Sequence, residues 1–231
     1  MPPQPLIEPE ADAERLGLDR AIADAVRARL ASGPRPSADA DAIALRQSLQ
    51  GLAPAEASTL RAVLGRIDAA AGAPLVVWGS ASQTLAADRH GLTARTAADP
   101  DQALAVVRDG ARALMDLSPS SGWWGRLLAE PALRVVGALP DDRHGLPRAL
   151  VVQQARPGPT GDDRTFWTTD SAAPSATIVE ALAAAGLIAS PLMAAGGLKL
   201  FMLAGYVQAE DGRLSSAPGG LSGVIGAAPV F

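Results

Sequence analysis

The chain has 231 residues, 48% hydrophobic and 19% charged, a balance typical of a globular protein able to bury a sizeable core. Its net charge of −4 argues against a nucleic-acid partner, which needs clustered Lys and Arg, and the lack of a long apolar run argues against a membrane partner. The absence of cysteine excludes disulfides and thiolate chemistry, and the absence of a basic and apolar leader leads us to expect a cytoplasmic protein.

Three amphipathic helices are predicted in the first third of the chain. They cover about residues 11–31, 39–50 and 54–71. In the first, Leu18, Ile22 and Val26 recur at the spacing of one helical face. Pro and Gly residues separate the three helices and mark their ends. The short connections leave three apolar stripes to be covered, either by a second copy of the chain or by the segment that follows.

Arg29 continues the apolar face of the first predicted helix. A buried guanidinium needs an anion or another acceptor as a partner. The alternative is that the side chain reaches solvent beside the C-terminal end of the helix dipole. The pattern leaves both interpretations open.

Residues 11–72 resemble the small all-helical chorismate mutases, because a Leu-Asp pair beginning at Leu18 is followed by Arg29. The resemblance implies an isomerase that converts chorismate to prephenate, acts as a homodimer, and uses neither a cofactor nor a metal. Such a rearrangement needs cations that hold the substrate carboxylates and stabilise charge on the ether oxygen. The resemblance assigns this role to Arg29, together with Arg15 or Arg46.

The lysine that this family places near the end of its first helix has no counterpart here, because Lys199 is the only lysine. Arg15, Arg35 and Arg46 are therefore the candidate substitutes, although Arg and Lys bind anions with different geometry. The site implied by the resemblance is a cluster of arginines on the helical segment.

Residues 74–155 alternate short apolar strands with helices, which predicts a mainly parallel sheet with helices packed on it. The expected strands cover about residues 75–78, 92–96, 111–116, 133–139 and 148–154. A Ser/Gly turn precedes a short helix that contains Trp123 and Trp124. Because neighbouring helical residues point in different directions, we expect one ring in the core and one at an interface, or alternatively lining a ligand cleft.

This middle segment offers little evidence of a cofactor or a metal. The Gly-Ser-Ala-Ser turn that begins at Gly79 lacks the paired glycines and the lysine of phosphate loops, so no nucleotide cofactor is expected. His90 and His144 lie far apart without clustered acidic residues, so no metal site is expected either. His90 is expected to cap a helix or to face solvent.

The same segment resembles a shortened prephenate dehydratase domain. The resemblance rests on the strand–Gly–helix opening, the helix led by Asp99-Pro100, and the strand that ends in Leu139-Pro140. That family's Thr-Arg-Phe triplet is matched here by Arg164, Thr165 and Phe166 in a different order. The resemblance therefore implies a remnant of the domain rather than an active dehydratase.

Residues 164–231 are predicted to form a strand, a helix and two strands, followed by a Gly-rich tail that packs on the body or crosses to a partner. The last of these strands, about residues 198–207, holds Lys199, for which we expect a strand-edge or interface position, and Tyr206, the only tyrosine. The βαββ order and the turn after Tyr206 resemble the start of an ACT domain. In prephenate dehydratases this domain binds phenylalanine, through a motif that has no counterpart near residues 192–196.

The three resemblances occur in the order of the bifunctional enzyme of phenylalanine synthesis. The expected fold is α+β, with about three N-terminal helices, a small α/β sheet domain and a βαββ ACT-like segment. We interpret the chain as a chorismate mutase-like protein of aromatic amino-acid biosynthesis. The alternative is a non-catalytic relative that binds an aromatic metabolite or a partner enzyme.

Overall fold

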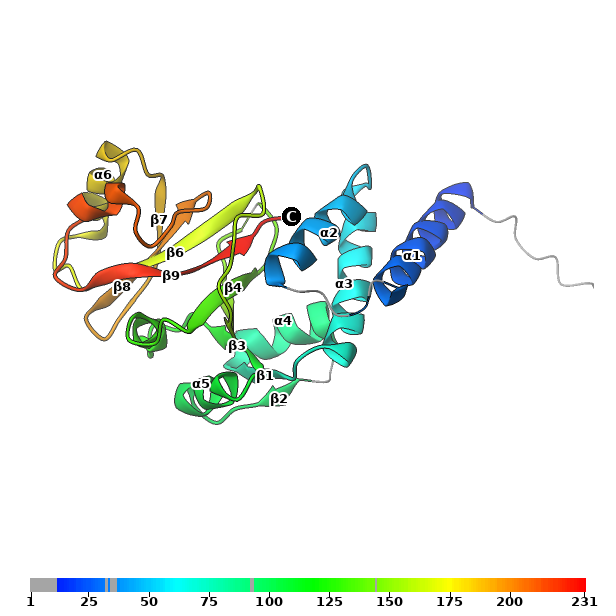
Figure 1. Cartoon of the computed structure of the whole chain (residues 1–231), viewed down its shortest axis with the longest axis horizontal. Coiled ribbons are helices and arrows are strands. Elements are labelled where there is room, and N and C mark those ends of the chain that lie inside the picture. Colours follow the sequence, from blue (N-terminus) through cyan, green and yellow to red (C-terminus); the bar gives the residue numbers. More distant parts are fainter. Residues whose placement is uncertain (1–11, 32, 34–36, 92–93, 144) are drawn as a thin grey trace, which may run out of the picture.

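The computed structural model describes residues 12–31, 33, 37–91, 94–143 and 145–231 (Figure 1). It confirms the predicted α+β class, because three helices are followed by a large mixed sheet. The helices are α1 (Ala13–Ala31), α2 (Ala38–Leu49) and α3 (Pro54–Ala71). The middle segment contains β1 (Leu75–Trp78), α4 (Ser80–His90), β2 (Arg95–Thr96), α5 (Pro100–Arg108), β3 (Arg112–Asp116), the 3₁₀ helix η1 (Trp123–Leu128), β4 (Leu133–Leu139) and β5 (Ala149–Gln154). The last segment contains β6 (Asp163–Thr169), α6 (Ser175–Ala184), β7 (Ala189–Ala195), β8 (Leu198–Ala204), the 3₁₀ helix η2 (Gly212–Ser216) and β9 (Ser222–Pro229).

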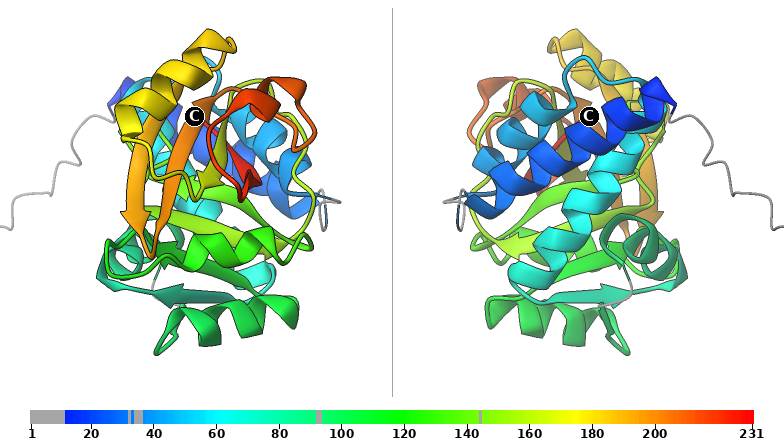
Figure 2. Two further views of the ribbon diagram at one scale, coloured as in Figure 1. Left: turned by 90° about the vertical axis from the view of Figure 1, so that its left-hand side faces the viewer. Right: turned by 90° about the vertical axis from the view of Figure 1, so that its right-hand side faces the viewer.

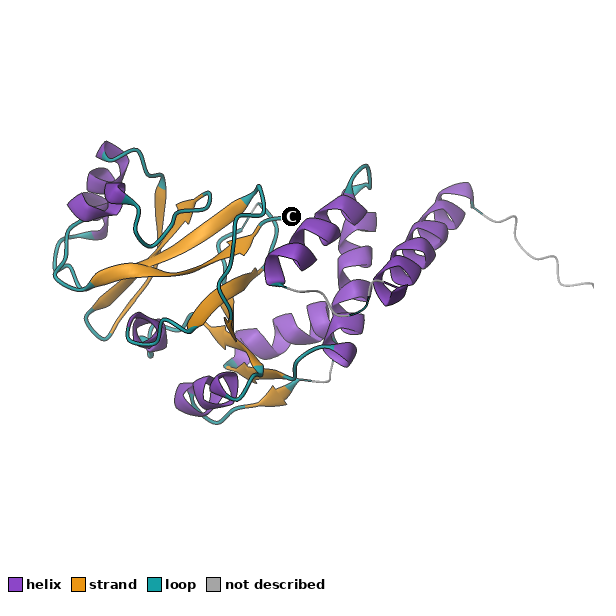
Figure 3. Cartoon of the chain, in the orientation of Figure 1, coloured by secondary structure: helices purple, strands orange, loops and turns teal. Residues whose placement is uncertain are grey.

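Within the described residues, nine strands form one sheet in the order β2-β1-β3-β5-β4-β9-β6-β8-β7. Figure 3 shows the strands in orange and the helices around them in purple. We call β2-β1-β3-β5-β4 the first half and β9-β6-β8-β7 the second half. In the first half, β1 is parallel to β2 and β3, while β5 is antiparallel to its neighbours β3 and β4. In the second half, β6 and β7 point the same way with β8 between them, which is a split βαβ unit. The predicted strand–helix–strand–strand order is therefore confirmed.

The Gly-rich end of the chain forms a central strand, not the predicted tail. β9 pairs antiparallel with β6 along the whole length of that strand. It meets β4 at one parallel register pair, Val135 with Gly226. Gly226 has a φ of +144°, and a Cβ at this position would run into the backbone of Val135. The glycine therefore permits the close approach that joins the two halves of the sheet.

The two faces of the sheet carry different helices (Figure 2). Face A is covered by α5 and η1, and its core runs through both halves, from Val76 in β1 to Phe166 in β6 and Leu200 in β8. On face B, α4 covers one end through Ala86, and α6 covers the other end through Ile178. The middle of face B, beside α4, is left to the N-terminal helices.

Trp123 and Trp124 are both buried on face A, in a core shared by the middle and C-terminal segments, so neither ring is exposed at the surface. Their rings contact edge to face with centroids 6.1 Å apart, and Trp123 Nε1 donates to the Asp116 carbonyl oxygen over 2.7 Å. The helix η1 also packs tightly against the β7–β8 hairpin, because a Cβ on Gly125 would touch the side chain of Leu198. The two tryptophan rings therefore leave η1 in different directions and both pack against protein.

Lys199 lies on an inner strand and bonds to backbone carbonyl oxygens, so it is not a strand-edge charge. β8 lies between β6 and β7 in the sheet. The Lys199 ammonium donates to the carbonyl oxygens of Ser171 and Ala173, at 2.6 Å in each case. These bonds hold β8 to the loop that precedes α6. None of the helices within the described ranges is long and apolar enough to cross a bilayer.

Candidate functional site

A cavity of about 680 Å³ lies on face B, between the helices α1–α3 and the strands β4 and β5. This volume is in the range of sites for small molecules. The apolar part of its lining is formed by Leu45, Leu64, Ile67, Leu75, Val136, Val151 and Phe231. The polar part is formed by Arg29, Asp41, Asp68, Arg89, His90, Arg112 and Gln153. We call this space the helix–sheet cavity.

Arg29 reaches this cavity from the last turn of α1. Its Nε atom is 2.6 Å from Asp68 Oδ1 on α3, and its Nη1 atom donates to the Gly33 carbonyl oxygen over 3.0 Å. The side chain is 14% exposed, so the guanidinium does not reach solvent beside the helix end. Of the two interpretations left open by the sequence, the structure selects a buried arginine with an anionic partner.

Arg112 is the cation of the cavity that carries no carboxylate partner among the described residues. It opens β3, and its guanidinium donates to the carbonyl oxygens of Ala73, at 3.1 and 3.2 Å, and Asp68, at 3.4 Å. Burial lowers the pKa of Arg112 below the ordinary value, while the charges of Asp68 and Asp41 act in the opposite direction. Backbone carbonyl oxygens solvate a guanidinium without neutralising it, so positive charge remains available to a ligand.

His90, expected to cap a helix or to face solvent, lies in the last turn of α4 and lines the same cavity, so it does not simply face solvent. Burial, together with the charges of Arg89 and Arg112, lowers the pKa of His90 to about 4. The imidazole is therefore neutral near pH 7. With His90 neutral, the three arginines and two aspartates of the lining leave a net charge of +1.

Arg89 contributes to the wall but has its own anionic partner. Its Nε atom is 3.3 Å from Asp141 Oδ2, and Arg61 approaches Asp141 Oδ1 over 2.7 Å. Arg89 also donates to the Arg61 carbonyl oxygen. One carboxylate thus holds α3 and α4 together through two arginines, which fixes the wall of the cavity.

The three arginines assigned to the site from the sequence do not come together. Arg29 lines the helix–sheet cavity, whereas Arg15 is exposed near the start of α1. Arg46 lies outside the cavity lining and bonds to the second half of the sheet. Arg35, the further candidate, lies outside the described residues, as does His144.

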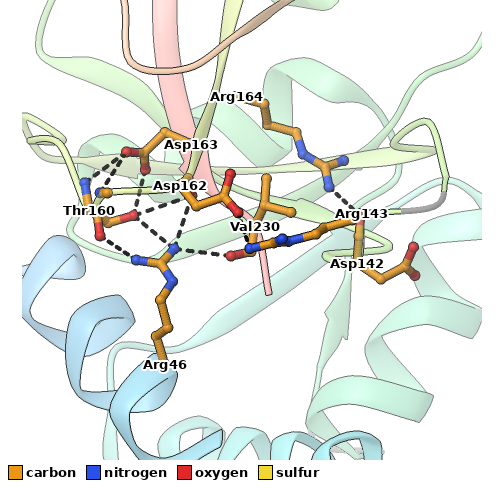
Figure 4. A network of polar contacts seen from close by, with 9 residues as sticks. Arg46, Asp142, Arg143, Thr160, Asp162, Asp163, Arg164 and Val230 are labelled. Atoms are coloured by element: carbon orange, nitrogen blue, oxygen red, sulfur yellow. Dashed lines mark hydrogen bonds and ion pairs between the residues drawn. The ribbon is translucent and has the colours of Figure 1, made fainter. Parts of the chain in front are cut away.

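Arg46 connects α2 to the second half of the sheet (Figure 4). Its guanidinium donates to the carbonyl oxygens of Thr160, Asp162 and Val230, the last two over 2.9 and 3.0 Å. It also donates to Thr160 Oγ1 over 3.2 Å and lies 5.6 Å from the centroid of the Phe231 ring. These contacts give Arg46 a structural role, because every bond goes to a group of the protein that needs a donor.

The turn after β1 is closed by the protein's own carboxylate. Asp116, at the end of β3, accepts hydrogen bonds from the backbone N–H groups of Ala81 and Ser82 in the first turn of α4. A Cβ on Gly79 would collide with the Asp116 side chain. The helix N-terminus that could hold a phosphate is therefore occupied by Asp116. In the described part of the chain, no three His, Asp or Glu side chains are grouped to hold a metal ion.

Arg89, Arg112 and Gln153 were not singled out from the sequence. Arg112 had a local signal, since it is a charged residue directly before the apolar run Ala113–Met115. Arg89 and Gln153 had none, because their positions in the cavity depend on how α4 and β5 are registered against distant parts of the chain.

Comparison with known proteins gives weak similarities. No protein-family model matches the chain, and no curated protein matches its sequence. Among solved structures, a protein described as GqqA, a novel type of quorum quenching acylase, is 18% identical with a TM-score of 0.46, covering 68% of this chain and 95% of its own. Prephenate dehydratase from Streptococcus mutans is 12% identical with a TM-score of 0.39, covering 68% and 98%. Prephenate dehydratase from Arthrobacter aurescens, in complex with L-Phe, is 12% identical with a TM-score of 0.37, covering 68% and 90%. Because the identities are 18% or less and the TM-scores are below 0.5, these similarities assign no activity to the chain.

Proposed function

We propose that the helix–sheet cavity binds a small organic carboxylate with an apolar ring, the chemical class of chorismate and prephenate. The observation that carries the proposal is Arg112, a cation buried against backbone carbonyl oxygens and facing a cavity of about 680 Å³. A ligand carboxylate supplies the anion that Arg112 lacks among the described residues. The apolar walls formed by α2, α3 and β5 accommodate the ring.

The finer proposal is that the bound ligand is chorismate and that it rearranges to prephenate. This reaction requires no nucleophile and no proton transfer, which suits a cavity whose histidine is neutral. It requires cations that favour the transition state over the ground state. Arg29 and Arg112 take this role, in place of the pairing of Arg29 with Arg15 or Arg46 that the sequence favours.

A specific observation supports the second candidate, a non-catalytic relative that binds an aromatic metabolite. Arg29 is bonded to Asp68 over 2.6 Å, so a substrate carboxylate has to compete with this carboxylate for the guanidinium. A cation already neutralised in the ground state contributes less to a developing negative charge. Binding through Arg112 alone would then occur without turnover.

One set of measurements separates the two candidates. Loss of chorismate absorbance on adding purified protein measures turnover, and isothermal titration with prephenate and with phenylpyruvate measures binding. The matched variants are Arg112→Gln and Arg95→Gln, because Arg95 is an exposed arginine on β2 outside the cavity lining. We expect Arg112→Gln to weaken binding by about tenfold or more, since a hydrogen bond to a charged group contributes about 1.5–3 kcal/mol.

The outcomes are distinct. Turnover that Arg112→Gln or Arg29→Gln abolishes supports the mutase reaction, and binding without turnover supports the non-catalytic relative. If chorismate, prephenate and phenylpyruvate all fail to bind, or bind equally well to Arg112→Gln, the assignment of the cavity is wrong.

The homodimer predicted from the sequence stays a prediction. On α1, Leu16 and Leu30 are 50% and 67% exposed, and none of the helix's described residues is fully buried. A second copy of the chain would cover this apolar surface. Sedimentation equilibrium tests it, and a single species with the mass of one chain would contradict it.

A further inference from the structure

A second cavity of about 520 Å³ lies where the two halves of the sheet meet. Its walls come from both halves: β4 and the residues flanking it, the chain after β5, the segment after β8, and β9. We call it the junction cavity. A separate space of about 10 Å³, lined in part by Val136, Pro157 and Ala227, lies between it and the helix–sheet cavity. Because that volume is at most the size of one water molecule, the two cavities are distinct sites.

Two arginines face the junction cavity. Arg134, on β4, donates from Nη1 to the carbonyl oxygens of Leu127 and Leu133, at 3.2 Å in each case. Arg156 follows β5 and is exposed. Neither forms an ion pair with a carboxylate of the described residues. Burial lowers the pKa of Arg134, the charge of Arg156 lowers it further, and Glu210 acts in the opposite direction.

Two guanidinium groups that repel each other across an open cavity lack an anion between them. An anion placed between them would remove the repulsion and add charge-assisted hydrogen bonds. Glu210, also in the lining, offsets one of the two charges only from a distance, since it makes no ion pair within the described part of the chain. The net charge of the lining is therefore +1 from Arg134, Arg156 and Glu210.

The rest of the wall is mixed, because Gln208 and the Tyr206 hydroxyl are polar while Val224 and the Tyr206 ring are apolar. Val207 and Ala227 are 3% and 4% exposed, and Val224 packs against the core beneath α6. The Tyr206 hydroxyl donates to the Pro157 carbonyl oxygen over 2.8 Å, which holds the aromatic ring beside the linker. A pocket with a cationic end and a partly apolar wall recognises a molecule with an anionic head and a compact, partly apolar body.

We propose that the junction cavity binds a small organic carboxylate, whose head group lies between Arg134 and Arg156 and whose apolar body packs on the Tyr206 ring and Val224. The site is independent of the function proposed for the helix–sheet cavity. Its ligand contacts both halves of the sheet, whose strands meet at the register pair Val135–Gly226. A bound ligand therefore also stabilises the packing of the two halves against each other.

Tyr206 provides a direct readout, because it is the only tyrosine of the chain and it lines this cavity. Protein labelled with ¹³C in the tyrosine ring is titrated with sodium phenylacetate and, separately, with inorganic phosphate. We expect a saturable shift of the Tyr206 ring signals with phenylacetate. Arg156→Gln is expected to weaken this binding by about tenfold, because it removes a charged hydrogen-bond donor. Arg156 makes no hydrogen bond to other described residues, so the variant is expected to fold like the natural chain.

Two control variants make the test specific. Arg95→Gln removes an exposed positive charge far from the cavity, and Arg112→Gln changes the helix–sheet cavity, so both should leave the Tyr206 titration unchanged. The proposal is overturned if no saturable shift occurs up to about 10 mM phenylacetate, an affinity too weak for a built site. It is also overturned if Arg156→Gln leaves the titration unchanged, if Arg112→Gln abolishes it, or if phosphate binds and phenylacetate does not.

Discussion

Replacement of Arg46 by alanine should release α2 from the sheet. The substitution removes four hydrogen bonds and leaves the carbonyl oxygens of Thr160, Asp162 and Val230 without their donor. If each carbonyl costs about 1 kcal/mol and the lost contact with the Phe231 ring costs about 0.5–1 kcal/mol, the loss is about 3–5 kcal/mol. That is a large share of the stability of an ordinary domain.

Urea unfolding followed by circular dichroism measures the global free energy of unfolding, and hydrogen exchange at the α2 amides measures local release. Arg46→Lys keeps the charge but loses the planar fork that reaches several acceptors, so it should recover only about 1 kcal/mol. Arg27→Ala is the control, because Arg27 is 74% exposed and, among the described residues, pairs with Asp24 alone on the surface of α1, at a cost below about 0.5 kcal/mol. If Arg46→Ala changes neither measurement by more than Arg27→Ala does, the assignment of Arg46 as the anchor of α2 is wrong.

Other parts of the fold give sharp expectations. Gly226→Ala should lower the free energy of unfolding by about 3 kcal/mol or more, because a Cβ meets the Val135 backbone, while Gly212→Ala, with open space around it, should be nearly neutral in urea unfolding. The unfolded chain protonates His90 below about pH 6.5 but the folded chain only below about pH 4, so stability should fall by about 3 kcal/mol as the pH drops through that window. A pH series of urea unfolding checks this, and His90→Gln should show a correspondingly smaller decline; an identical decline would refute it. Asp116→Asn should cost about 1–2 kcal/mol in thermal or urea unfolding, since it weakens the cap on α4, and an unchanged midpoint would contradict that role.

Local signals account for the parts of the fold that were predictable. The N-terminal helices begin and end at Ser, Pro and Gly residues, and Ser37 caps α2 by accepting from the Ala40 N–H. Asp99 caps α5 in the same way, by accepting from Gln102. Caps and breakers act within four residues of the chain, so the sequence contains the whole of the interaction.

The strand β9 was not predictable in this way. Its sequence, SGVIGAAP, is rich in small residues and lacks the run of β-branched or aromatic residues that marks a strand. It is a strand because β6 pairs with it along its length and because Gly226 lets it approach β4. Those interactions are made by residues far apart in the chain, and single-chain patterns do not report them.

The candidate site likewise combines residues that local sequence identifies with residues that only distant contacts place. Arg29 was found from its place on a helical face, yet its partner Asp68 lies 39 residues away. Arg46 has a conspicuous charge but serves the fold, since its acceptors lie 114 to 184 residues further along the chain. Arg112 reaches the cavity because β3 starts beneath the α3–β1 connection, a consequence of sheet register and not of local sequence. Residue type thus identified possible cations, and only tertiary contacts separated ligand-facing ones from structural ones.

The sharing of one sheet by both halves limits how the chain can be divided. A fragment ending after β5 would leave the β4 edge without β9 and would uncover the face A core that continues into Phe166. A fragment beginning at β6 would expose β9 in turn. Open strand edges of this kind pair with other chains, so each fragment alone is prone to aggregate. A protease cut in the linker between β5 and β6 would have a different result, because both edges stay paired and the nicked halves remain associated.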